Sequence, residues 1–243
     1  MMKICMIYYA FLNTMLLREA EALIERGHHV DIICLGRVNT AKQEYSNNLN
    51  VYRVQRREYG EKGIFSYLWK YGRFFISSSF LVTLLHVIRS YNLIHVTSPP
   101  DFIVFTSFFP KFLGAKIILD IHDIMPEFFA RKFGYGDKHW SVRLLKWIER
   151  ISAKFSDHVI TVTDLWKTTL VNRSVPESKC SVLLNVPDTK IFKREDKKER
   201  PGSEQFTLFY PGNVDFGVDT LIKAMRIISR EIPFVRLKIY GSG

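Results

Sequence analysis

The chain has 243 residues, of which 47% are apolar, enough for one large domain or for one and a half. Its three cysteines, Cys5, Cys34 and Cys180, are far apart and lie in or beside apolar runs. This spacing excludes a disulfide framework and a thiolate metal site, and it indicates a reduced, cytosolic protein. The net charge of +11 indicates an anionic partner, such as nucleic acid, membrane headgroups or phosphorylated small molecules. The first residues lead directly into a strand-like run, so no signal peptide is expected.

The N-terminal segment is predicted to be a strand–helix–strand unit. Lys3–Ala10 is a strand, Met15–Arg26 is a helix closed by a glycine, and His29–Leu35 is a second strand. Such a unit opens a doubly wound parallel sheet. No G-x-G-x-x-G follows the first strand, but Asn13 and Thr14 could present a helix N-terminus to an anion. Plain N-capping would equally explain them.

A polar, loop-like segment over residues 36–50 and a short strand, Val51–Val54, come next. Basic and aromatic residues then alternate over residues 53–73, as in RNA-stacking surfaces, in membrane contacts at the lipid interface, or in a solvated loop followed by a helix with aromatic core anchors. Phe74–Ile88 is apolar but shorter than the roughly 20 residues that span a bilayer. It predicts a mostly buried helix, with monotopic membrane insertion as the alternative.

Two buried strands are predicted to end in polar turns. Leu93–Thr97 is followed by Ser98 and two prolines, and a helix over Phe102–Leu113 then leads to the run KIILDIHDIMPE, residues 116–127. His122 and Asp123 follow this second strand, where ligands collect in open α/β sheets. A histidine with a neighbouring carboxylate suits proton transfer, although capping of the next turn would also explain the pair. Parallel neighbouring strands would place both turns at one crevice.

The following segment continues the alternation of helices and strands. Ser141–Phe155 is predicted to be a helix with an apolar stripe of Leu144, Ile148, Ile151 and Phe155, and with a basic face that lies on an anionic membrane or is merely solvated. Strands over His158–Val162 and Cys180–Leu184 flank a helix over Asp164–Asn172. The last of these strands ends at Asn185.

A composition change marks a domain boundary. Residues 193–204 are charged and contain Pro-Gly, which is typical of a linker between a first domain, residues 1–192, and a second one, residues 205–243. Strands over Phe206–Tyr210 and Val235–Tyr240 and a helix over Val218–Arg230 form another strand–helix–strand unit. The chain stops at a glycine-rich turn, so we expect it to be the front part of something longer.

Several segments in order resemble the family 4 glycosyltransferases of the GT-B fold. MKICMIYYA with REAEALIERGHHVDIICL resembles the opening βαβ unit of that family, and NLIHVTSPP resembles its D-x-I-H-x-H-x-P strand. KIILDIHDIMPE resembles the strand that carries the active-site histidine. The stretch from SDHVITVTD to NVPDTKIF resembles the approach to N-x-x-D-x-x-x-F. LFYPGNVDFGVDTLIKAM with LKIYGSG resembles the start of the donor-binding domain.

This resemblance implies an α/β architecture of two Rossmann-like domains, with the acceptor on the first and a nucleotide-sugar on the second. It implies a retaining glycosyltransferase that needs no metal and no further cofactor. His122 matches the catalytic-site histidine, and Asp123 would orient it. Ser98 and Asn13 would lie near the acceptor or the diphosphate, and Gly212 and Asn213 would form the turn that faces the diphosphate. The candidate substrate-binding residues are Asn13, Thr14, Ser98, Glu127, Asn185, Gly212 and Asn213.

The chain also departs from the family pattern. The Gly-Gly of the first loop is replaced by Phe11-Leu12-Asn13, and the positions of the basic residues that grip the donor diphosphate fall near Asn213 and Phe216. The E-x7-E segment, which holds the donor sugar and ribose, would lie beyond Gly243. We therefore expect little or no transferase activity without the missing part.

Three functions are compatible with these residues. The first is a cytosolic, membrane-peripheral glycosyltransferase that acts on a lipid-linked or polysaccharide acceptor in surface glycan synthesis. The second is a noncatalytic acceptor-binding subunit that needs a separate donor-domain chain. The third is a basic nucleic-acid-binding domain. The absence of RNA-binding sequence motifs disfavours this third function, so we expect no nucleic-acid partner.

Overall fold

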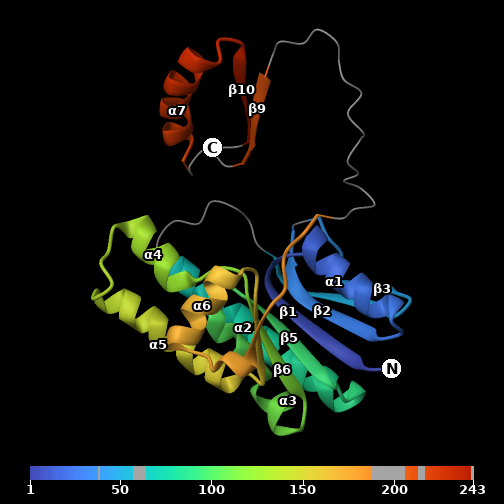
Figure 1. Ribbon diagram of the computed structural model, residues 1–243. Helices are drawn as coiled ribbons and strands as arrows, with labels where there is room; N and C mark the ends of the chain where they lie inside the picture. The colour runs from blue at the N-terminus through green and yellow to red at the C-terminus, as the bar shows by residue number, and fades with distance from the viewer. Residues whose placement is uncertain (38, 57–63, 188–205, 213–216, 242–243) are drawn as a thin grey trace. The chain divides into compact units, whose positions relative to one another are not determined.

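The computed structural model describes residues 1–37, 39–56, 64–187, 206–212 and 217–241 (Figure 1). The chain divides into two compact units, Met1–Val186 and Pro187–Gly243. Each is described by itself below.

The first unit is an α/β domain with one eight-stranded sheet in the order β3-β4-β2-β1-β5-β6-β7-β8. All neighbouring strands are parallel except β3 and β4, which are antiparallel. The strands are β1 (Lys3–Phe11), β2 (His29–Gly36), β3 (Gln43–Ser46), β4 (Leu49–Arg56), β5 (Leu93–Ser98), β6 (Lys116–Ile121), β7 (His158–Thr161) and β8 (Cys180–Val182).

Helices cover the two faces of this sheet unequally. On one face α1 packs over β1 and β2, where Leu16 and Ala20 join a core with Ile4, Met6 and Ile32. The opposite face carries the larger core, to which α2, the 3-10 helix η1, α5 and α6 all contribute. The helices of the unit are α1 (Thr14–Glu25), α2 (Ile64–Arg89), η1 (Asp101–Ser107), α3 (Phe108–Phe112), α4 (Met125–Phe133), α5 (Trp140–Phe155), α6 (Asp164–Arg173) and the short 3-10 helix η2 (Glu177–Lys179).

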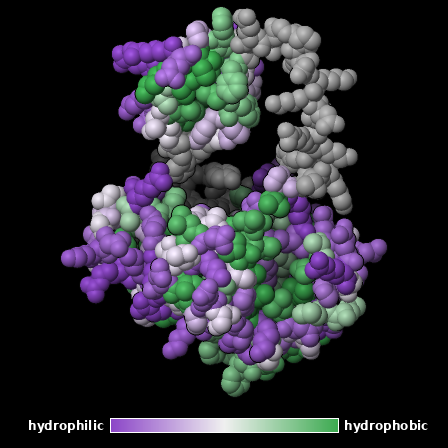
Figure 2. All heavy atoms as spheres, in the orientation of Figure 1, coloured by the Kyte–Doolittle hydropathy of each residue, from purple (hydrophilic) through white to green (hydrophobic). Residues whose placement is uncertain are grey.

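The second unit is small. Strands β9 (Phe206–Pro211) and β10 (Val235–Tyr240) are parallel and are connected by α7 (Val218–Glu231). Of its described residues only Val218 is buried. Figure 2 shows apolar side chains at its surface beside the hydrophilic ones of α7.

Most predicted elements are present, and four predictions are corrected. The polar segment after β2 contains β3, a fully exposed strand that pairs with β4, and β4 extends beyond Val51–Val54 at both ends. The predicted helix over Phe102–Leu113 begins as the 3-10 helix η1. In α5, Leu144 is exposed, and the buried face instead contains Val142, Glu149 and Ser152.

The fourth correction concerns α2, which was expected to be mostly buried. Phe74, Val82 and Leu85 do pack on the sheet, because these positions recur on one side of the helix. Ile76 and Phe80, however, are about three-quarters exposed (70% and 73%). The helix is therefore apolar on its outer side as well as on its inner side.

Candidate active site

His122 lies directly after β6 and is held by Asp120, two residues before it. The imidazole Nε2 of His122 is 2.8 Å from Oδ2 of Asp120. The Nε2 of His95, on β5, is 3.2 Å from the same oxygen. His95 and Asp120 are both buried, whereas His122 is partly accessible. One carboxylate thus connects two histidines from neighbouring strands at the end of the sheet where β5 and β6 terminate.

Asp120 and His122 shift one another's pKa values toward the charged forms. Burial alone would raise the pKa of Asp120, but the hydrogen bonds from His122 and His95 outweigh it and lower that pKa to about 2. Burial alone would likewise lower the pKa of His122, but the hydrogen bond and charge of Asp120 raise it overall. Asp120 is therefore ionised at neutral pH and can only accept, so both imidazoles donate through Nε2. This leaves Nδ1 of His122 for a ligand.

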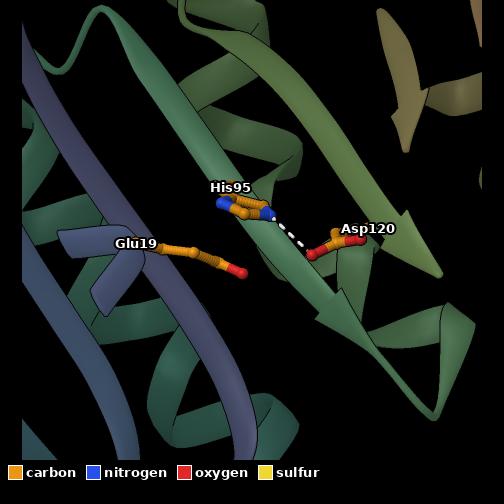
Figure 3. A group of neighbouring side chains, drawn as sticks. All are labelled: Glu19, His95 and Asp120. Carbon is orange, nitrogen blue, oxygen red and sulfur yellow. Dashed lines mark hydrogen bonds and ion pairs between the residues drawn. The ribbon is translucent and has the colours of Figure 1, made fainter. Parts of the chain in front are cut away.

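Glu19 of α1 is the fourth member of the cluster. His95 pairs in register with Met6, which belongs to the core under α1, so His95 and α1 share one face of the sheet. Figure 3 shows Glu19 reaching from α1 toward His95 and Asp120. Burial raises the pKa of Glu19. Among the described residues none gives a hydrogen bond to its buried Oε2.

Glu19, His95 and Asp120 are also the group in the described part of the chain that could hold a metal ion. Each offers one ligand atom, and these atoms lie within 4.8 Å of one another. Carboxylates and imidazole are ordinary ligands of divalent cations. The two imidazole hydrogen bonds to Asp120 already account for its position, so the geometry does not require an ion.

Asp123 does not orient His122 as the sequence suggested. Its side chain is exposed, and Asp120 is the hydrogen-bond partner of the imidazole. Side chains two residues apart in an extended segment lie on the same side, whereas adjacent ones lie on opposite sides. The two-residue spacing of Asp120 and His122 therefore predicts their contact, whereas the adjacency of Asp123 to His122 does not.

Asn13 and Thr14 lie at the start of α1, and Asn13 acts as its N-cap. Its Oδ1 accepts a hydrogen bond from the amide of Leu16 at 2.9 Å, and its Nδ2 lies 3.3 Å from the hydroxyl of Tyr8. Burial is the main cause of a raised pKa at Tyr8, which also feels the negative charges of Asp123, Glu19 and Asp120. The capping residue is thus next to the cluster. Thr14 is exposed.

Ser98 is fully buried, which argues against its predicted contact with a substrate. Its hydroxyl donates a hydrogen bond to Asp101, which is also buried. Burial raises the pKa of Asp101 to about 6, and the hydrogen bond from Ser98 opposes that rise. The pair holds the turn after β5 rather than presenting a group to a ligand.

Glu127 is engaged by Arg173 of α6, which argues against a free substrate-binding role. Arg173 bridges Glu127 on α4 and the fully buried Glu149 on α5, with its Nη2 at 2.9 Å from Oε2 of Glu127 and its Nε at 2.8 Å from Oε1 of Glu149. The arginine thereby fastens three helices.

Asn185 is exposed and lies beside α1, the helix that carries Glu19 of the cluster. Its Oδ1 lies 3.4 Å from a guanidinium nitrogen of Arg18, which also donates to the carbonyl of Val186 at 2.8 Å. Arg18 is the neighbour of Glu19 in α1. This segment therefore lies against the helix that borders the cluster.

The predicted diphosphate turn belongs to the second unit. The amide of Gly212 donates to the carbonyl of Tyr240 at 2.9 Å and so connects the ends of β9 and β10. A Cβ at this position would lie 3.2 Å from the nearest atom of the Tyr210 ring, so that side chain would have to shift slightly. Asn213 lies outside the described residues.

Three members of the cluster, Asp120, His95 and Glu19, were not among the predicted site residues. Asp120 could have been found from its spacing to His122. The position of His95 follows only from the register of β5 with β6, and that of Glu19 from the packing of α1, neither of which a single sequence specifies.

Comparisons with known proteins agree with this description. A model of Glycosyltransferase Family 4 matches residues 12–190. Sucrose-phosphate synthase from Thermosynechococcus elongatus has a TM-score of 0.67 at 16% identity, over 98% of this chain and 62% of that one. The catalytic domain of starch synthase IV from Arabidopsis thaliana, bound to ADP and acarbose, has a TM-score of 0.62 at 15% identity, over 99% and 69%. Alr3699/HepE from Anabaena, in complex with UDP-glucose, has a TM-score of 0.56 at 12% identity, over 99% and 70%.

The chain thus spans less than two thirds of the length of the sucrose-phosphate synthase structure. No curated protein matches it. The structural likenesses, all at low identity, confirm the predicted α/β class and GT-B fold. Since the family model covers most of the chain and the described fold agrees with it, the protein belongs to Glycosyltransferase Family 4.

Proposed function

We propose that the protein takes part in the transfer of a sugar from a nucleoside diphosphate sugar to a hydroxyl group of an acceptor. The reaction joins the acceptor oxygen to the anomeric carbon and releases the nucleoside diphosphate and the hydroxyl proton. The observation that carries the proposal is the arrangement of His122 on Asp120 and His95 at the end of β5 and β6. The family match supports the class of reaction.

His122 is suited to contact the reacting groups. Its Nε2 is occupied by Asp120, so Nδ1 is the atom available to a ligand. A neutral imidazole would accept a hydrogen bond from a sugar hydroxyl through Nδ1, and a protonated one would donate to an anionic oxygen. The hydrogen bond and charge of Asp120 raise the pKa of His122 and so favour its protonated form. Asp120 acts as a positioning residue through His122.

A nucleoside diphosphate sugar is the class of donor supported by the comparisons. The Anabaena protein is bound to UDP-glucose and the Arabidopsis enzyme to ADP. In the second unit of this chain, Gly212 directly follows β9, at the position that the resemblance assigns to the turn facing the diphosphate.

The acceptor that we propose is lipid-linked or a growing polysaccharide in surface glycan synthesis. The protein would work in the cytoplasm at the inner face of the cell membrane. Support comes from the net charge of +11, which favours an anionic surface, and from the buried free cysteines, which suit a reducing compartment.

The proposal is tested with the full chain and panels of UDP-, GDP- and ADP-sugars. Calorimetry measures donor binding, and release of nucleoside diphosphate in the presence of lipid-linked or oligosaccharide acceptors measures transfer. His122→Ala should lower the transfer rate by about 10²- to 10⁴-fold, the usual contribution of a proton-transferring side chain. Asp123→Ala is the matched control, since it removes the adjacent exposed carboxylate and should change the rate much less.

Where the unaltered chain transfers sugar, an unchanged rate in His122→Ala would refute the catalytic assignment. Binding of acceptor without binding of any donor, by a folded chain, would instead favour a noncatalytic acceptor-binding subunit that works with a separate donor-domain chain.

A further inference from the structure

The outer side of α2 carries a continuous apolar stripe. Ile76, Phe80, Leu84 and Val87 follow one another at intervals of three or four residues, so they share one side of the helix, and all are exposed. Val87, for example, is 66% exposed. In a water-soluble domain an apolar surface of this length marks a site of interaction.

The stripe continues onto α3, which contacts α2. This short helix has the sequence FFPKF, and its Phe108, Phe109 and Phe112 are all exposed, the last by 83%. Leu113 directly after it is exposed as well. The two contacting helices α2 and α3 thus both present apolar side chains to the outside.

The helix α2 is long and apolar enough for a membrane span, but its inner side packs against the sheet. Within the described part of the chain, the segment Leu68–Arg89 is long and apolar enough to cross a bilayer, and 28% of its apolar window is buried. The inner side of α2 supplies Phe74, Val82 and Leu85 to the main core. Crossing a membrane would remove these side chains from the core, so only the outer stripe is free to enter lipid.

The charges around the stripe favour an anionic partner over a neutral one. Residues 64–119 contain five lysines and arginines but a single acidic residue, Asp101, which is buried and hydrogen bonded to Ser98. One of the five, Arg89, pairs with the buried Asp31 at 2.6 Å. Beyond this stretch, Asp157 faces Lys111 at 2.9 Å and Lys116 at 3.8 Å. A surface that is apolar and almost free of accessible carboxylates matches a bilayer with anionic headgroups.

We propose that the outer stripe of α2 and the exposed residues of α3 form a monotopic membrane-binding surface for anionic lipid. The helix α2 lies in the plane of the interface and its apolar side chains enter the acyl boundary. This deepens the membrane location in the proposed function, and vesicle binding does not depend on turnover, so the two can fail separately.

Vesicle flotation tests the surface. The full chain should float with vesicles of phosphatidylcholine and phosphatidylglycerol, and less with phosphatidylcholine alone. The double variant Ile76→Glu/Phe80→Glu should bind about tenfold or more weakly, because two apolar side chains no longer enter lipid. Both residues are highly exposed, so the fold should survive. Leu165→Glu, at a 74% exposed position on α6, is the matched control and should bind like the unaltered chain.

A second readout locates the contact. The native cysteines Cys5, Cys34 and Cys180 are buried, so a dye that senses polarity can be attached selectively at Phe112→Cys or at Leu165→Cys. Vesicles should shift the emission to the blue only at position 112. Equal binding by the glutamate variant, or equal shifts at both positions, would overturn the proposal. The proposal would also be overturned if the unaltered chain did not bind vesicles but formed a dimer, and the glutamate variant were a monomer. A second copy of the chain would then cover the stripe.

Discussion

At the scale of single residues, the coupling of Asp120 and His122 sets the pH range of the site. Asp120 has a lowered pKa, so its contribution to stability is present above its ordinary pKa of 3.8 and is lost as the pH falls toward 2. His122 has a raised pKa, so its contribution is complete below its ordinary pKa of 6.5 and is lost as the pH rises through the raised value. The pair therefore stabilises the fold most between pH 3.8 and pH 6.5.

Replacing Asp120 by asparagine should lower the pKa of His122. The charge and hydrogen bond that raise this pKa disappear, whereas the burial that lowers it remains. Titration of the imidazole by NMR measures the change directly. Asp123→Asn is the control and should leave the curve of His122 nearly in place, because Asp123 is a minor contributor. The reverse order of effects would restore the sequence-based assignment of Asp123 as the orienting residue.

A second residue-scale prediction concerns Asp101. Its folded-state pKa of about 6 exceeds the ordinary value of 3.8, so stability is present at low pH and is lost as the pH rises through about 6. The Asp101→Asn variant cannot ionise, and between about pH 3 and pH 8 it should gain about 3 kcal/mol in unfolding free energy relative to the unaltered chain. Denaturant unfolding at several pH values measures this difference.

The neighbouring serine offers a directional check on Asp101. Ser98→Ala removes the hydrogen bond that lowers the pKa of Asp101, so the loss of stability should extend to higher pH. A pH profile of Asp101→Asn parallel to that of the unaltered chain would contradict the assignment.

At the scale of elements, Arg173 holds α4, α5 and α6 together. Arg173→Met would leave Glu149 charged and without its partner in a fully buried position, which should cost about 3–5 kcal/mol of unfolding free energy. Glu127→Gln should cost less than about 1 kcal/mol, since Glu127 is exposed. The double variant Arg173→Met/Glu149→Leu should recover much of the loss. Denaturant unfolding measures these changes. If Arg173→Met and Glu127→Gln lowered the unfolding free energy equally, the Arg173–Glu149 pair would not be the main contact that holds the three helices together.

The helices and strands were largely predictable from the sequence, but which of their side chains are buried was less so. The runs that became β1, β2, β5 and β6 are apolar enough to predict buried parallel strands, whereas β3 is a polar edge strand stabilised by its pairing with β4. The apolar composition of α2 correctly predicts a helix. It cannot show which side faces the sheet when nearly all sides are apolar. The buried face of α5 contains Glu149, which is tolerated because Arg173 from a later helix pairs with it.

At the scale of the whole molecule, the two units differ in how much apolar surface they bury. The first unit has two cores, one on each face of an eight-stranded sheet. The described part of the second unit is a two-stranded parallel sheet with one helix, and Phe209, Ile222 and Ile227 are exposed. Three or more strands or a substantial packed face are usually needed for independent stability.

We therefore expect amide hydrogen exchange to separate the units. Amides of β1, β5 and β6 should exchange only through global unfolding, whereas those of β9 and β10 should exchange through local opening and be much less protected. Mass spectrometry of peptides from the two units reads this difference in one experiment. A donor nucleotide-sugar that binds the second unit beside Gly212 should slow exchange in β9 and β10 and leave β1 unchanged, because ligand binding stabilises only the unit that it contacts. Equal protection of both units in the absence of ligand would show that the second unit has a cover beyond its described residues, and it would contradict the independence on which this prediction rests.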